Sequence, residues 1–135
     1  MENKPAETFV DQLKDSINKK TNDPLVDQQI NDLLKAYLPQ KTYLEKRFSI
    51  AKLSYDLNIS ERVLSNYFNA YLEISFSSWK NKLRIQQAVQ LIDESQLKHV
   101  TIEGLGEMVG FQSRTNFIEV FKEHMGKSPS EYLKG

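Results

Sequence analysis

The sequence predicts an all-α protein: two helix-turn-helix subdomains, a long central helix that joins them, and an N-terminal helical extension. Three observations lead to this fold class. Glycine and proline are scarce, five and four in 135 residues, and they stand where helices should begin or end. No segment alternates apolar and polar residues between hairpin signals, as half-buried strands would. One pattern of apolar positions around a turn occurs twice, which indicates a duplicated unit.

Composition is that of an ordinary globular protein. The chain is 39% hydrophobic and 27% charged, and it has no cysteine, which fits a reducing compartment. No apolar run reaches the roughly 18–20 residues of a membrane-spanning helix. The N-terminus also lacks the basic start and apolar stretch of a signal peptide. We therefore expect a cytoplasmic protein without membrane contact.

The net charge of zero argues mildly against a nucleic-acid partner, because phosphate contacts usually need a basic surface. Residues 1–40 hold five lysines against seven acidic residues, so the rest of the chain carries a net charge of +2. This small excess must be concentrated on one face of the protein if it is to bind DNA.

Residues 1–40 are expected to be a helical extension or linker. Residues 1–22 are polar with a weak helical stripe, so a short helix and a frayed arm both fit. From Pro24 onward a helix is clear, because Asp23 can cap it and proline suits its first turn. The apolar face of this helix comprises Val26, Ile30, Leu33 and Tyr37. Pro39 ends the helix, and we expect it to pack on the first subdomain.

The two helix-turn-helix units are expected at about residues 49–72 and 101–125. Each begins with a hydroxyl cap, at Ser49 and Thr101. The first helix of each unit ends in a residue suited to left-handed backbone, followed by an apolar plug: Asn58–Ile59 in one, Gly110–Phe111 in the other. A second cap then opens the next helix, at Ser60 and Ser113. Such a tight turn makes the helices cross steeply and leaves one side of the second helix exposed.

Between the units, residues 77–93 are expected to form one long helix. Its apolar stripe comprises Trp79, Leu83, Ala88, Leu91 and Ile92. Trp79 and Tyr132 occupy equivalent places in the two repeats, and we expect both in the core. A stiff connector would fix the separation of the two exposed helices, and reading successive grooves of DNA requires about 34 Å between their centres. A monomer could then bind without dimer symmetry, and we expect a monomer.

Three segments of the second half of the chain are distinctive: the Val-Gly-Phe turn at 109–111, the aromatic and lysine run at 117–122, and the Gly-Lys-Ser-Pro-Ser-Glu-Tyr segment at 126–132. The central helix adds Leu83, Arg84, Ile85, Ala88 and Leu91. With these residues, the chain over 43–135 resembles the DNA-binding domain of the AraC/XylS family of bacterial transcription regulators. The first half of the domain is similar to regulators of Bacteroidetes-type bacteria.

The resemblance implies a DNA-binding domain over residues 41–135, with seven helices and two recognition helices that enter successive major grooves. Regulators of this type usually activate transcription by contacting RNA polymerase. The sequence departs from the family in two places: Glu73 follows the first recognition helix, where the family often has glycine, and Glu119 stands where a basic residue is common. The first recognition helix is also less basic than usual.

Helical periodicity divides each recognition helix into a core face and a face available to DNA. Arginine can bind guanine, and asparagine adenine, at two points each. The predicted base-contacting residues are Arg62, Ser65, Asn66 and Asn69 in the first unit and Arg114, Thr115 and Glu119 in the second. Arg114, near the N-terminus of its helix, is the strongest candidate. Glu119 fits either a cytosine amino group or an ion pair with Arg114 or Lys122.

The predicted phosphate-contacting residues are Lys80, Lys82, Lys122 and Lys127. Arg84 is expected to have a structural role instead, paired with an acidic residue between the subdomains.

The two histidines are remote in sequence from any cysteine or acidic cluster, so no metal or other cofactor is expected. We find neither a catalytic triad order nor a phosphate-binding glycine loop, so the chain is not expected to be an enzyme. The sequence predicts a sequence-specific DNA-binding transcription regulator; the alternative is a helical protein-interaction module with little DNA affinity.

Overall fold

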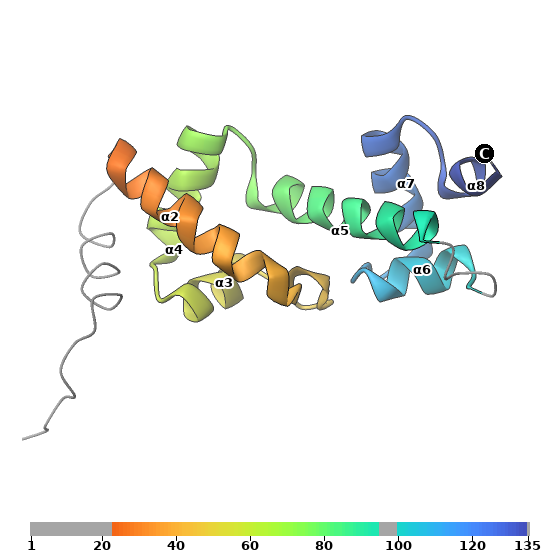
Figure 1. The fold of residues 1–135 in the computed structure, drawn as a ribbon, viewed down its shortest axis with the longest axis horizontal. Coiled ribbons are helices and arrows are strands. Elements are labelled where there is room, and N and C mark those ends of the chain that lie inside the picture. Colours follow the sequence, from red (N-terminus) through yellow and green to blue (C-terminus); the bar gives the residue numbers. More distant parts are fainter. Residues whose placement is uncertain (1–22, 95–99, 135) are drawn as a thin grey trace, which may run out of the picture. The chain divides into compact units, whose positions relative to one another are not determined.

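The computed structural model describes residues 23–94 and 100–134, which consist of helices and the turns between them (Figure 1). The weak apolar stripe within residues 1–22 and His99 lie outside the described residues. The described chain falls into two compact units. The first unit combines residues 23–40 with 49–76, and the second combines residues 41–48 with 77–134. An all-α fold, as predicted, is what the described residues show.

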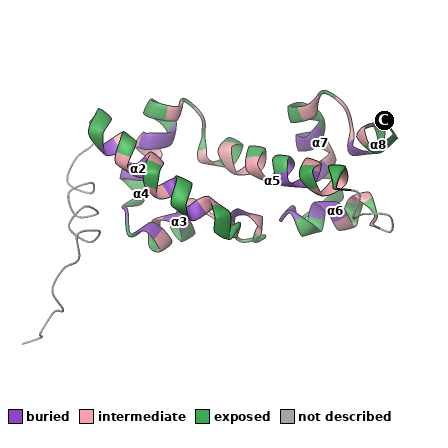
Figure 2. Ribbon diagram, in the orientation of Figure 1, coloured by how far each residue is buried: buried purple, intermediate pink, exposed green. Residues whose placement is uncertain are grey.

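The first unit begins with α2 (Pro24–Tyr37), followed by the short helix η1 (Leu38–Gln40). The predicted cap is present, because Oδ1 of Asp23 accepts a hydrogen bond from the N–H of Leu25 at 2.8 Å. The buried face comprises Val26, Ile30, Leu34 and Tyr37. The prediction places Leu33 on this face, but the buried residue is its neighbour Leu34. With 3.6 residues per turn both leucines lie near the apolar stripe, so the periodicity alone does not distinguish them. Figure 2 shows buried positions interleaved with exposed ones along α2.

The first helix-turn-helix comprises α3 (Ile50–Leu57), α4 (Glu61–Asn66) and a π-helical continuation, η3 (Tyr67–Leu72). Oγ of Ser49 accepts from the N–H of Lys52 at 3.1 Å, and Oγ of Ser60 accepts from the N–H of Val63 at 3.2 Å. Both predicted caps are therefore present. The buried side chains of these helices include Leu53, Leu57, Val63, Leu64, Tyr67 and Phe68.

The second helix of this unit changes from α to π geometry and ends in a strained residue. Glu73 follows η3 with φ 56° and ψ 37°, in the left-handed region. Glutamate is thus held in the backbone conformation that glycine adopts most easily. The glycine that the resemblance leads us to expect at this position would adopt this conformation without strain, and here the turn forms with glutamate instead.

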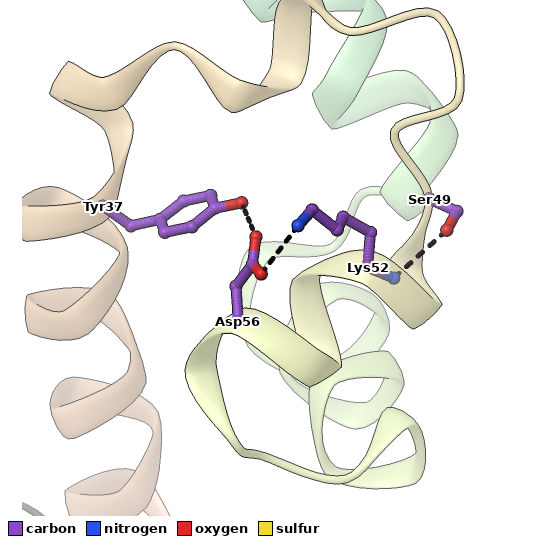
Figure 3. Close-up of polar contacts among 4 residues, drawn as sticks. All are labelled: Tyr37, Ser49, Lys52 and Asp56. Atoms are coloured by element: carbon purple, nitrogen blue, oxygen red, sulfur yellow. Dashed lines mark hydrogen bonds and ion pairs between the residues drawn. The ribbon is translucent and has the colours of Figure 1, made fainter.

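Helix α2 is joined to the helix-turn-helix by side-chain hydrogen bonds (Figure 3). The hydroxyl of Tyr37 donates to Oδ2 of Asp56 at 2.6 Å, and Nζ of Lys52 pairs with Oδ1 of the same carboxylate at 3.0 Å. Burial on its own would raise the pKa of Asp56, but the bonds from Tyr37 and Lys52 and the lysine charge lower the pKa on balance. A second link runs from the hydroxyl of Tyr67 to Oδ1 of Asn31 at 3.1 Å. The helix therefore packs on the first subdomain, as expected.

The second unit contains η2 (Thr42–Leu44), most of α5 (Phe76–Asp93), α6 (Ile102–Met108), α7 (Arg114–Met125) and α8 (Pro129–Lys134). Helix α5 covers the predicted range and begins one residue earlier. The core of the unit is formed by Ile85, Ala88, Leu105, Val109, Phe111, Phe117, Val120 and Phe121. Phe117 lies at its centre, with ring centroids 5.3 Å from Phe111 and 5.8 Å from Phe121.

The two predicted turns share one hydrogen-bond pattern. The N–H of Ile59 donates to the carbonyl of Ser54 at 3.2 Å, and the N–H of Phe111 donates to the carbonyl of Gly106 at 2.9 Å. Both bonds span five residues, as in a Schellman helix end. The residue before each plug is left-handed, with φ 55° at Asn58 and φ 95° at Gly110. The duplication read from the sequence is therefore present in the backbone.

Trp79 and Tyr132 are only half-buried, so their expected place in the core is wrong in part. The ring of Tyr132 lies against Phe121, with centroids 5.8 Å apart. Its hydroxyl donates to Oδ1 of Asp93 at 3.1 Å, which keeps one end of the side chain at the surface. Tyrosine side chains commonly bury the ring and leave the hydroxyl at the surface, where it can form hydrogen bonds.

Candidate nucleic-acid interface

Helix α7 separates a buried face from an exposed one. Oγ of Ser113 accepts from the N–H of Asn116 at 3.1 Å and caps the helix. Phe117, Val120 and Phe121 are buried, as predicted. The predicted base-contacting residues of this unit are all exposed: Arg114, Thr115 and Glu119. Arg114 is the first residue of α7, so its guanidinium extends from the end of a helix that the core holds in place.

The corresponding surface of the first unit is less uniform. Arg62 and Asn69 are exposed, whereas Ser65 and Asn66 are half-buried. Asn69 lies in the π-helical segment η3 rather than in α4. A π-helix has more residues per turn than an α-helix, so the side chains after position 66 no longer follow the α-helical periodicity from which the DNA face was predicted.

All four predicted phosphate-contacting lysines belong to the second unit. Lys82 and Lys122 are exposed, while Lys80 and Lys127 are half-buried. Nζ of Lys127 lies 5.4 Å from the centre of the Tyr132 ring, a cation–π distance. Burial lowers the pKa of Lys80, and the charge of Arg84 lowers it further.

Arg84 is buried, and its partners are backbone carbonyls rather than the expected acidic residue. Nε donates to the carbonyl of Tyr43 and Nη2 donates to the carbonyl of Glu45, each at 2.7 Å. These bonds attach residues 41–48 to α5 within the second unit. The expected acidic partner is therefore wrong, because two backbone carbonyls accept the hydrogen bonds of the guanidinium. The structural role of Arg84 is as expected.

A polar cleft of about 220 Å³ opens beside the first turn of α7. Three basic side chains line it: Lys46, Lys80 and Arg84. Three side-chain amides line it as well: Asn81, Gln112 and Asn116. The lining, completed by Ser77, Gly110 and Phe111, contains no carboxylate. The cleft thus gathers positive charge and hydrogen-bond donors at the end of the helix that carries Arg114.

Sequence reasoning singled out Lys80, and Arg84 in a structural role, but missed the other polar side chains of this cleft. Gln112 and Asn116 flank the predicted cap Ser113, so their position at the start of α7 could have been read from the sequence. Lys46 carried no such signal, because it lies far along the chain from the other lining residues, in the segment whose carbonyls at Tyr43 and Glu45 are bonded to Arg84.

Two further features are absent from the part of the chain that the structure describes. Residues 23–94 and 100–134 hold no group of three or more histidine, cysteine or acidic side chains placed to bind a metal ion. Within the same ranges, no helix has both the length and the apolar character needed to cross a membrane.

Comparison with known proteins places this geometry in a family. A family model described as a helix-turn-helix domain matches residues 53–135. The arabinose operon regulatory protein of Salmonella typhimurium is 35% identical to this chain over 91 residues, which is 67% of this chain and 31% of that protein. The chain therefore spans about a third of the length of the curated relatives it matches.

Solved structures agree with this assignment. A transcriptional regulator with an AraC-type DNA-binding domain from Chromobacterium violaceum is 25% identical, with a TM-score of 0.66 over 79% of this chain and 93% of that one. The DNA-binding domain of the global transcriptional factor AdpA, solved with a target DNA, shares the fold at 20% identity, with a TM-score of 0.62 over 76% of this chain and 89% of that one. Because the helix-turn-helix model covers most of the chain and these relatives share both sequence and fold with it, the chain belongs to the AraC-type helix-turn-helix family of transcription regulators.

Proposed function

We propose that this chain binds DNA sequence-specifically and regulates transcription, with α7 and the α4–η3 helix as its two recognition elements. The observation that carries the proposal is the exposed N-terminal face of α7. Arg114 and Thr115 extend from a capped helix whose opposite face is buried in an aromatic core. The core and the cap hold the backbone at this end of α7 in place, and arginine can bind guanine at two points.

The roles of the individual residues follow from their exposure. Arg114, Thr115 and Glu119 would contact bases from the second unit. In the first unit Arg62 and Asn69 have the reach to do so, while half-buried Ser65 and Asn66 would contact only closely approaching groups. Lys82 and Lys122 would bind phosphates beside them, and Lys127 and Lys80 would do so from partly buried positions.

We further propose that the chain acts in the cytoplasm as a monomer that reads two successive grooves, with recognition helices about 34 Å apart. It would activate transcription through contact with RNA polymerase and would have no catalytic role. Size measurement of the DNA complex by light scattering and transcription in vitro with added polymerase test these two points.

Selection of bound sites from a random DNA pool, followed by titration of one selected duplex and a scrambled one, tests the main proposal. Arg114→Ala should lose roughly 1–3 kcal/mol on the selected site and little on the scrambled duplex. Arg114→Lys is the matched control, because it keeps the charge and loses the two-point geometry. It should lose the preference and keep the salt dependence.

The results also separate the second candidate, a protein-interaction module, which the net charge of zero favours. That candidate predicts no enriched sequence and a nearly flat dependence of affinity on salt. A DNA binder instead gives a log–log slope that grows by about 0.9 for each phosphate contact. Selection without enrichment would refute sequence-specific binding.

A further inference from the structure

The cleft beside the first turn of α7 has the chemistry of an anion site. Lys46 approaches it from residues 41–48, and Lys80 approaches from α5, with buried Arg84 forming part of the wall. Arg84 is fixed by its bonds to two carbonyls, so its charge is a permanent part of the lining. Three cations around one cleft whose lining holds no carboxylate repel one another, and an anion between them would relieve that repulsion.

Neutral donors complete the site. The side-chain amides of Asn81, Gln112 and Asn116 line the cleft. Each amide offers two N–H donors, which suits the several acceptor oxygens of a phosphate group. Helix α7, 12 residues long, begins at the same place, and the dipole of a helix favours an anion near its N-terminus. Burial lowers the pKa of Lys80 and the charge of Arg84 lowers it further, and a bound anion would raise that pKa again.

The position of the cleft indicates which anion it would hold. Arg114 and the capping Ser113 stand at the same end of α7 as Gln112 and Asn116. A recognition helix that contacts bases with its N-terminal residues has the phosphates of the groove edge beside that end. We propose that this cleft binds one backbone phosphate of the DNA next to the groove that α7 enters, with Lys46 and Lys80 as its principal ligands. The proposal rests on the DNA-binding function argued above.

Such a site would set affinity and position rather than sequence preference. The test compares Lys46→Gln/Lys80→Gln with Lys35→Gln/Lys134→Gln, which removes two exposed lysines outside the cleft. Both variants lose the same charge, so a general electrostatic effect would appear equally in both. Circular dichroism and thermal unfolding should first show that the four substitutions leave the helices and their stability intact.

DNA affinity is then measured between 50 and 200 mM salt on a selected duplex and a scrambled one. The cleft variant should bind both duplexes more weakly, with an unchanged preference and a log–log slope smaller by about 1. Over this fourfold salt range its affinity should fall about 3.5-fold less than that of the unsubstituted protein. The control variant should keep the original slope. Equal slopes for the two variants would overturn the phosphate site while leaving DNA binding in place.

A second measurement keeps the two proposals distinguishable. Inorganic phosphate is titrated into the isotope-labelled protein at constant ionic strength, with chloride as the reference anion. The side-chain amides of Gln112 and Asn116 and the backbone amide of Gly110 should shift, and the side-chain amide of Asn31, which belongs to the first unit, should not. If no duplex binds but these shifts occur, the cleft binds phosphate, and the proposal that this phosphate comes from DNA is overturned. If no shifts occur either, the site itself is refuted.

Discussion

Replacing Gly110 with alanine would test how closely the second turn packs on the rest of its unit. A Cβ at this position would lie 2.5 Å from the carbonyl oxygen of Leu44 and 2.9 Å from Cζ of Arg84. Such a distance to a backbone oxygen is too short for a carbon atom, so the turn, η2 or the guanidinium must move. The backbone here also has φ 95°, which side chains other than glycine rarely adopt.

The expected loss of stability has two parts. Left-handed backbone costs an L-residue roughly 1–2 kcal/mol, of which about 0.4–1 kcal/mol is recovered because alanine restricts the unfolded chain. Moving Arg84 weakens its bonds to the carbonyls of Tyr43 and Glu45, and each hydrogen bond from a charged donor is worth about 1.5–3 kcal/mol. Loss of one such bond brings the total for Gly110→Ala to about 2–4 kcal/mol.

Gly126→Ala is the matched control. Gly126 also has positive φ, at 77°, but no atom lies within 4 Å of its hypothetical Cβ. It should therefore lose only the backbone part, about 1 kcal/mol or less. Trp79 is the single tryptophan and lies in α5, so urea unfolding followed by its fluorescence reports on the second unit. Stability losses that agree within about 0.5 kcal/mol for the two variants would refute the argument that close contact, rather than backbone strain, dictates glycine at position 110.

Two further predictions concern the first unit. Glu73→Gly should raise the free energy of unfolding by about 0.5–1 kcal/mol, since it removes left-handed strain, and denaturation followed by circular dichroism that shows no gain would contradict this. Tyr37→Phe should cost about 1.5–3 kcal/mol at neutral pH by removing the donor to the Asp56 carboxylate. Because the pKa of Asp56 is lowered by folding from its ordinary 3.8, this stabilisation is complete above that pH and is lost as the pH falls below it. The variant should therefore lose less stability in acid, and a carboxyl titration followed by NMR that left the pKa of Asp56 unchanged would rule out the role given to Tyr37.

Features that depend on a few neighbouring residues could be predicted from the sequence. The caps at Ser49, Ser60 and Ser113 and the left-handed residues at 58 and 110 were all found, because each is decided within one helical turn. The duplicated unit followed from comparing these local patterns. The exposed face of α7 was also correct, since 3.6-residue periodicity holds along a regular helix.

Features that depend on distant or irregular contacts could not be predicted. The carbonyl partners of Arg84 lie about forty positions earlier, and a backbone carbonyl has no sequence signal. The π-helical segment at 67–72 shifted the register of the first recognition helix, and nothing in its residue types indicates the change. The cleft beside α7 could not be predicted for the same reason. One of its lining residues, Lys46, comes from residues 41–48, and the bonds from Arg84 to that segment span about forty positions of the chain.

The second unit is discontinuous along the chain. Residues 41–48 lie between α2 and α3, yet they belong with α5 to α8, where they supply both carbonyl acceptors of Arg84. A fragment that begins at Ser77 would keep nearly all of α5 and every later helix, but it would leave the buried guanidinium of Arg84 without these acceptors, which is costly in an apolar interior. No single cut within the described residues therefore yields two intact units, because the eight residues 41–48 separate the two segments of the first unit while belonging to the second.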